Sequence, residues 1–209
     1  MGVEMNAVLN SYRLKIARQY HSFVSDRSGV TIIEFAFIVP VILFMLLGMF
    51  DMGRYMLLNQ KLDRAAATMS DLTSRPSSIS AAEINQLMIA AIEVVQPFDL
   101  ASKGGVIVSS VYKNPGDPAE ITWQIQGAGP TLPPSLYGGV GDPANMPAGF
   151  VVRDNENVIT AEVYFRFEPV FLDFLSSFFD SGGLLPEGVI VQTALRQPRL
   201  GDLSTLSVP

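Results

Sequence analysis

The apolar residues form one long uninterrupted run near the N-terminus and several shorter periodic segments after it. From Val30 to Phe50 the sequence holds 21 residues, of which only Glu34 is ionisable. As an α-helix this run would be roughly 31 Å long, which matches the thickness of the hydrocarbon core of a bilayer. The alternative is a buried helix of a soluble domain, but such helices rarely run this long without a polar face. We therefore predict a membrane-spanning helix.

The helix is predicted to continue beyond the apolar run to about Ser74. The sequence contains no Gly or Pro between Arg54 and Pro76 and is rich in helix-forming residues. Apolar residues recur there mostly at steps of three and four, which is typical of an amphipathic helix. We expect this apolar stripe to contact a partner surface; its members are Leu58, Leu62, Ala65, Ala66, Met69 and Leu72.

A second, shorter helix is predicted after a break at Arg75–Ser78. Ser80 and Glu83 have the spacing of a capping box, and Pro97 lies just beyond the expected end at about Val95. One face of this helix is apolar, and we expect it to lie on a sheet. That face is formed by Ile84, Leu87, Met88, Ala91, Ile92 and Val95.

Four strands are expected in the second half of the chain, because β-branched residues and period-two alternation gather there. Trp123 should lie in the core, on one buried face with Ile121 and Ile125. The predicted strands are Gly105–Tyr112, Glu120–Gln126, Val158–Glu168 and Val189–Arg196. The predicted fold class is therefore α+β: a long transmembrane helix that continues as an amphipathic helix, then a small antiparallel sheet with a packed helix.

Two segments do not fit this alternation of elements. Residues 127–157 are rich in Gly and Pro and are predicted to be a surface loop, since they lack the spacing of a phosphate-binding loop. Residues 170–179 are strongly apolar but too short to span a membrane. This second segment is either a core helix or an apolar loop against a membrane or a partner.

Charge and composition argue against several classes of function for this protein. Residues 1–29 carry a net charge of +2 and the remaining 180 residues −8, which argues against nucleic-acid binding. The chain has no cysteine, and its single histidine, His21, lies in the basic leader. Its carboxylates are scattered, and the sequence shows no catalytic constellation. We therefore expect no enzymatic activity, no metal site and no cofactor.

The predicted organisation has four parts. They are a basic leader at 1–29, a transmembrane helix at 30–52, a helix extension at 53–75 and an α+β domain at 76–209. The basic residues near the span lie on both of its sides, so charge alone does not decide the orientation.

Glu34 is the unusual residue of the span, because a lone carboxylate in lipid is costly and suggests a function. The plain alternative is a side chain that reaches back to the membrane interface. The sequence from Gly29 to Glu34, after a basic leader and before an apolar run, resembles a type IV prepilin processing site. This resemblance implies a cut between Gly29 and Val30 on the cytoplasmic side, and a recognition and assembly role for Glu34.

The residues around Glu34 narrow the resemblance further. Over residues 28–67 the sequence resembles the TadE/TadF minor pseudopilins of tight-adherence (Flp-type) pilus systems, although many relatives have Glu where Asp51 stands. The residues that carry the resemblance are Glu34, Phe35, Ala36, Pro40, Gly48, Asp51, Gly53 and Arg54.

The resemblance also implies partners and a location. The partners would be a prepilin peptidase, other pilins or pseudopilins, the inner-membrane pilus assembly platform and the lipid bilayer. The chain would cross the bacterial inner membrane once, with its N-terminus cytoplasmic and its C-terminal domain periplasmic. The resemblance does not distinguish a TadE type of role from a TadF type. It also leaves open two fates for the chain: incorporation in the pilus or at its tip, or priming of pilus assembly alone. An uncut membrane-anchored extracytoplasmic binding protein is the alternative.

Overall fold

The computed structural model describes residues 28–127, 129, 133–171 and 188–207. The leader with His21 and most of the apolar segment 170–179 lie outside the described residues, so the predictions for them stay predictions. The chain divides into two compact units, residues 1–48 and residues 49–209.

One helix accounts for the predicted span and its extension. Helix α2 runs over Ser28–Thr73, 46 residues, with Pro40 inside it. This confirms the long helix that the sequence predicts from Val30 to about Ser74. The shorter helices bounded within the described residues are α3 over Ala81–Val95 and α4 over Leu100–Lys103.

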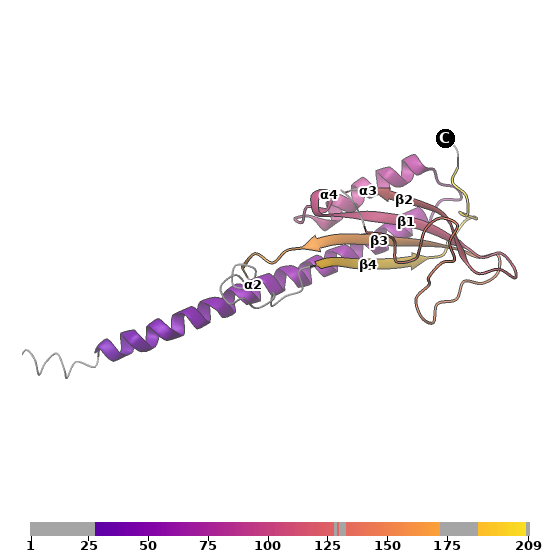
Figure 1. Cartoon of the computed structure of the whole chain (residues 1–209). Helices are drawn as coiled ribbons and strands as arrows, with labels where there is room; N and C mark the ends of the chain where they lie inside the picture. Colours follow the sequence, from indigo (N-terminus) through magenta and orange to yellow (C-terminus); the bar gives the residue numbers. More distant parts are fainter. Residues whose placement is uncertain (1–27, 128, 130–132, 172–187, 208–209) are drawn as a thin grey trace, which may run out of the picture. The chain divides into compact units, whose positions relative to one another are not determined.

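The four predicted strands are present and form one antiparallel sheet (Figure 1). The order of the strands across the sheet is β2-β1-β3-β4, so each edge strand pairs with only one other strand of the sheet. Every strand begins and ends within one residue of its predicted boundary. The strands are β1 Gly104–Tyr112, β2 Glu120–Gly127, β3 Asn157–Phe167 and β4 Gly188–Arg196.

The amphipathic part of α2 packs inside the chain's own domain. Its stripe residues Leu58, Leu62 and Met69 are at most 1% exposed and share a core with α3 and with one face of the sheet (Figure 1). Our expectation that this stripe contacts a partner surface is therefore wrong. The sheet presents its own apolar face to the stripe, through residues such as Val108 and Ala161.

Helix α3 begins with the predicted capping box. The backbone N–H of Glu83 donates to the Ser80 hydroxyl oxygen at 3.3 Å, and the Ser80 N–H donates to Glu83 Oε2 at 2.8 Å. These hydrogen bonds from the Ser80 backbone and side chain favour the ionised form and lower the pKa of Glu83. The cap fixes the start of α3, whose buried residues Ile84, Met88, Ala91 and Val95 face the core.

A β-bulge changes the face on which Ile121 lies. Ser110 pairs with Trp123 and Val111 with Ile121, so Thr122 is an extra residue in β2. An extra residue reverses the alternation of side chains beyond it. Trp123 lies in the core under α2 and α3, as predicted, whereas Ile121 lies in a second cluster on the opposite face. The prediction of one shared face for these two residues is wrong.

The loop between β2 and β3 covers that opposite face. Tyr137 and Val152 from the loop are buried with Val111, Ile121 and Val158 in a second apolar cluster. The loop is irregular, as predicted, but it also supplies part of a core, which the sequence analysis did not foresee.

A buried carboxylate holds this loop on the sheet. Glu162 in β3 is fully buried; its Oε1 accepts the backbone N–H of Leu136 at 2.9 Å, and its Oε2 accepts the Tyr164 hydroxyl at 3.1 Å. Burial raises the pKa of Glu162, and hydrogen bonds from Ser135, Tyr164, Leu136 and Tyr137 partly oppose this rise. Burial and the neighbouring Glu162 charge raise the pKa of Tyr164 as well.

We expect the Glu162→Gln variant to reveal this raised pKa. When the folded-state pKa of a carboxyl lies above the unfolded value, its contribution to stability is fully present below the unfolded value and is lost as pH rises through the folded value. The wild type should therefore gain stability relative to Glu162→Gln as pH falls from neutral toward 4.5, the ordinary value for glutamate. Thermal unfolding of both proteins across this range measures the difference, with the solvent-facing Glu93→Gln as control. A difference that does not change with pH would contradict the raised pKa.

Candidate functional site

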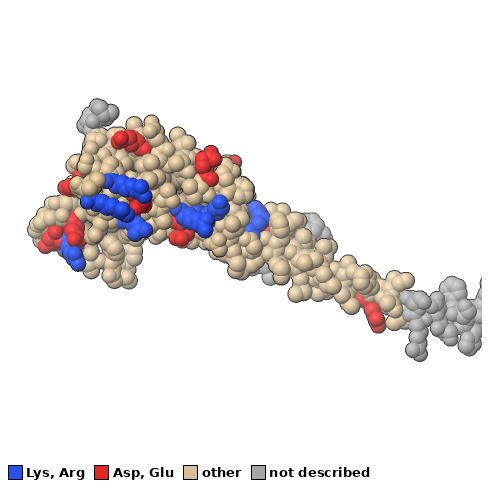
Figure 2. All heavy atoms as spheres, turned by 180° about the vertical axis from the view of Figure 1, so that it is seen from behind, with Lys and Arg blue, Asp and Glu red and all other residues tan. Residues whose placement is uncertain are grey.

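The N-terminal part of α2 exposes apolar side chains on all sides. Ile32 is 70% exposed, Phe37 75% and Met45 68%, and Figure 2 shows this part of the helix mostly in the colour of uncharged residues. Among the described residues, one helix is long and apolar enough to cross a membrane, and it is α2. An apolar surface of this extent indicates a membrane or a partner. The helix fits a single-pass membrane anchor.

The predicted processing bond lies in the first turn of this helix. No atom lies within 4 Å of the position that a Cβ on Gly29 would take, and Val30 is 55% exposed. The first backbone N–H groups of a helix have no partner within the helix, so this turn can open at little cost. A cut at the Gly29–Val30 bond stays a prediction.

Glu34 lies one helical turn after Val30 and is exposed. Residues four apart in a helix are neighbours on one face. The bond predicted to be cut and the carboxylate predicted to act in recognition are thus on the same side of α2. The surrounding exposed side chains Ile33, Phe35 and Phe37 leave Glu34 in an apolar environment once this part of the helix enters lipid.

The remaining motif residues do not gather at one place. Phe35, Ala36, Pro40 and Gly48 lie along the apolar part of α2, whereas the Asp51–Arg54 group belongs to the second unit. Nothing lies within 4 Å of the position of a Cβ on Gly53. The structure therefore separates the motif into an exposed apolar part and a polar part in which Asp51 is buried.

Asp51 forms the buried polar part. Its side chain is fully buried, with Oδ1 accepting the backbone N–H of Val170 at 3.1 Å and Oδ2 accepting that of Phe171 at 2.8 Å. Arg54 Nη1 lies 3.5 Å from Asp51 Oδ1, and the Arg54 guanidinium lies 5.9 Å from the centre of the Phe167 ring. Asp51 thus joins α2 to the segment that follows β3.

Aromatic contacts strengthen the same junction. Phe50 packs edge-on against Phe171 with ring centres 5.5 Å apart, and Tyr55 packs edge-on against Phe167 at 5.3 Å. Asp51 and Arg54 belong to the motif that the sequence predicts, whereas the sequence gives no sign of the contact between Asp51 and the segment at Val170 and Phe171. Asp51 and Val170 are 119 residues apart, and no local pattern connects them.

The comparisons with known proteins agree with the sequence resemblance. Residues 29–69 match the family model described as TadE-like protein. No curated protein and no solved structure matches the chain. The match confirms the predicted TadE-like segment and indicates involvement in a tight-adherence (Flp-type) pilus system.

The described residues of the TadE-like segment show no arrangement of side chains typical of a catalytic site. TadE-like pilus-associated proteins are in general not enzymes. Within the part of the chain that the structure describes, no group of three or more His, Cys, Asp or Glu side chains is arranged to hold a metal ion. The segment offers an exposed carboxylate on an apolar helix, and within the second unit a buried aspartate that binds the chain after β3.

Proposed function

We propose that this chain is a minor pseudopilin that takes part in assembly of a tight-adherence (Flp-type) pilus and so helps cells adhere. In this proposal a prepilin peptidase cuts the Gly29–Val30 bond on the cytoplasmic side of the inner membrane. The cut chain stays anchored by α2, with its C-terminal domain in the periplasm. It then packs by α2 against other pilins or pseudopilins at the assembly platform.

One observation carries the proposal: Gly29 and Glu34 stand five residues apart at the start of an exposed apolar helix, inside a segment that matches TadE-like proteins. The exposure of Val30 and Glu34 and their place on one face of α2 support the proposal of a processing site. A plain membrane anchor would need neither the glycine nor the carboxylate.

Glu34 has a specific role in this proposal. Cleavage creates a free α-amino group on Val30, and the Glu34 carboxylate of one subunit pairs with this amino group of a neighbouring subunit. In a low-dielectric surrounding such a pair relieves the cost of an isolated charge. The pairing would set the axial position of adjacent α2 helices.

Co-expression with a prepilin peptidase tests the cleavage directly. We expect the wild-type chain to lose residues 1–29 and to begin at Val30 by N-terminal sequencing. Gly29→Leu should abolish the cut, because the peptidase must accommodate an extended backbone at this bond. The matched control is Gly53→Leu: Gly53 is a second α2 glycine with open space at its Cβ position, and this variant should be cut normally.

The alternative is an uncut single-pass anchor whose extracytoplasmic domain binds a ligand or partner. It predicts the same chain length with and without an active peptidase. A chain that still begins at Met1, in cells that process their other pilins, would favour this alternative over the pseudopilin.

A further inference from the structure

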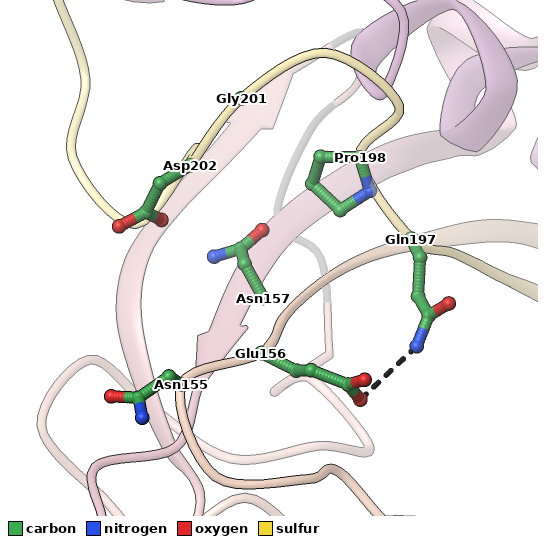
Figure 3. A pocket seen from close by; sticks show the side chains of 7 residues that line it. All are labelled: Asn155, Glu156, Asn157, Gln197, Pro198, Gly201 and Asp202. Atoms are coloured by element: carbon green, nitrogen blue, oxygen red, sulfur yellow. Dashed lines mark hydrogen bonds between the residues drawn. The ribbon is translucent and has the colours of Figure 1, made fainter.

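A polar pocket lies in the second unit, between the turn before β3 and the segment after β4. Its volume is about 350 Å³, and its polar lining residues are Asn155, Glu156, Asn157, Gln197 and Asp202 (Figure 3). Two of these residues are carboxylates, and no lysine or arginine is among the residues that line it. The lining therefore presents negative charge.

Two lining amides each donate one N–H to the protein itself. Asn157 Nδ2 donates to Ser110 Oγ at 2.6 Å, and Gln197 Nε2 donates to Glu156 Oε2 at 3.2 Å. The Ser204 N–H donates to Asp202 Oδ1 at 2.8 Å, which leaves the other carboxylate oxygen of Asp202 to the pocket. The pocket thus offers mainly hydrogen-bond acceptors.

One of these acceptors is buried and has no partner. The Ser110 hydroxyl donates its single proton to the Leu203 carbonyl at 3.0 Å, so it can only accept from Asn157. This fixes the Asn157 amide, whose oxygen points toward Pro198 among the lining residues (Figure 3). Asn157 is 8% exposed, and its Oδ1 has no hydrogen-bond partner within the described residues. Leaving a buried acceptor unpaired is unfavourable, and a hydrogen-bond donor in the pocket would relieve this cost.

The outer wall of the pocket is held in place by α2. The Arg199 N–H donates to the Ser74 carbonyl at 3.1 Å, and Arg199 Nη2 donates to Asp71 Oδ1 at 3.1 Å. Gly201 lies against Ser77, where an added Cβ would come within 2.7 Å of the Ser77 carbonyl oxygen. The segment that carries Gln197 and Asp202 is therefore fixed in advance of any binding, which lowers the cost of ordering it.

The basic group that pairs with Glu156 only partly offsets the charge of the pocket. Arg153 Nη1 lies 3.5 Å from Glu156 Oε1, but the Arg153 side chain is 82% exposed. Such an exposed pair is weak. Asp202 has no basic partner among the described salt bridges.

We propose that this pocket binds a cationic nitrogen group, a guanidinium or a primary ammonium, carried by an arginine or lysine side chain of another protein. Such a group donates several hydrogen bonds to a lining made of acceptors, and its charge complements the two carboxylates. A neutral hydroxyl ligand would leave Asp202 without a counter-charge. The proposal does not depend on cleavage of the chain or on its role in a pilus.

Trp123 provides a built-in reporter for this pocket. It is the only tryptophan of the chain, and its Nε1–H donates at 2.7 Å to the Leu203 carbonyl, the same oxygen that Ser110 binds. Binding at Asn157 or Asp202 should therefore shift the Trp123 indole N–H resonance. The full chain in detergent micelles would be titrated with methylguanidinium, with acetyl-Gly-Arg-Gly-amide, and with the neutral isostere in which citrulline replaces arginine.

We expect a saturable shift with methylguanidinium and with the arginine peptide, and none with the citrulline peptide. Asp202→Asn keeps the acceptor for Ser204 and removes the charge, so it should weaken binding about two- to fivefold, the range for an exposed ion pair. The matched control is Asp117→Asn in the exposed β1–β2 turn, which should bind like the wild type. This comparison stands even if substitutions of the buried Asn157 prevent folding.

The proposal is overturned if neither cationic probe gives a saturable shift, if the citrulline peptide acts like the arginine peptide, or if Asp202→Asn binds as tightly as the wild type. A response to methylguanidinium without any response to the arginine peptide would overturn the side-chain partner and assign the pocket to a free small cation.

Discussion

Replacing Glu34 with leucine is expected to abolish pilus formation while the chain still reaches the membrane. Removal of a charge from lipid favours insertion, by up to about 3 kcal/mol at the centre of a span and by less near its end. Assembly should fail because the α-amino group of a neighbouring subunit then faces lipid without its carboxylate partner. Piliation and surface attachment of the variant cells, measured with the membrane level of the protein, give the result.

The controls separate a role in assembly from a role in cleavage or folding. Thr31→Leu is the control: it introduces leucine, as Glu34→Leu does, at another exposed residue near the start of α2. This variant should leave piliation unchanged. Glu34→Leu protein should still be cut to a large extent, because the scissile bond lies outside the apolar run. Normal piliation at a normal level of Glu34→Leu protein would contradict the pairing role and favour the plain anchor.

Asp51→Ala is expected to destabilise the second unit by about 2–4 kcal/mol. The change leaves the N–H groups of Val170 and Phe171 without their acceptor and removes the carboxylate beside Arg54. Thermal unfolding of the full chain in detergent, followed by the fluorescence of Trp123, measures the loss.

Asp63→Ala is the matched control for this prediction. Asp63 lies on the same helix and is exposed, so its removal should change the stability by no more than about 0.5 kcal/mol. Equal melting temperatures for the two variants would show that Asp51 does not hold the junction.

The fold followed from the sequence where the pattern is local. The apolar run, the spacing of Ser80 and Glu83 and the alternation in each strand depend on residues a few positions apart, and the corresponding elements are all present. The bulge at Thr122 was missed because it depends on the register between two strands. The stripe on α2 was assigned to a partner because periodicity shows that a face is apolar, not which surface covers it.

The candidate site, like the fold, could be predicted from the sequence only where its residues lie close together in the chain. The TadE-like segment was found from the run of residues between Gly29 and Arg54. The junction of Asp51 with Val170 and Phe171, and the network of Ser110, Asn157 and Leu203, join residues that lie far apart in the sequence. Such contacts are set by tertiary packing, and a single sequence carries no signal for them.

Deletion of the gene for this chain, in the cells that make it, tests the central claim most directly. The measurement is the number of surface pili per cell by electron microscopy, with the wild-type chain and the Glu34→Leu variant supplied in trans. The account predicts that pili are lost on deletion, restored by the wild-type chain and not restored by Glu34→Leu. Normal pili in the deletion strain would contradict a role of this chain in pilus assembly.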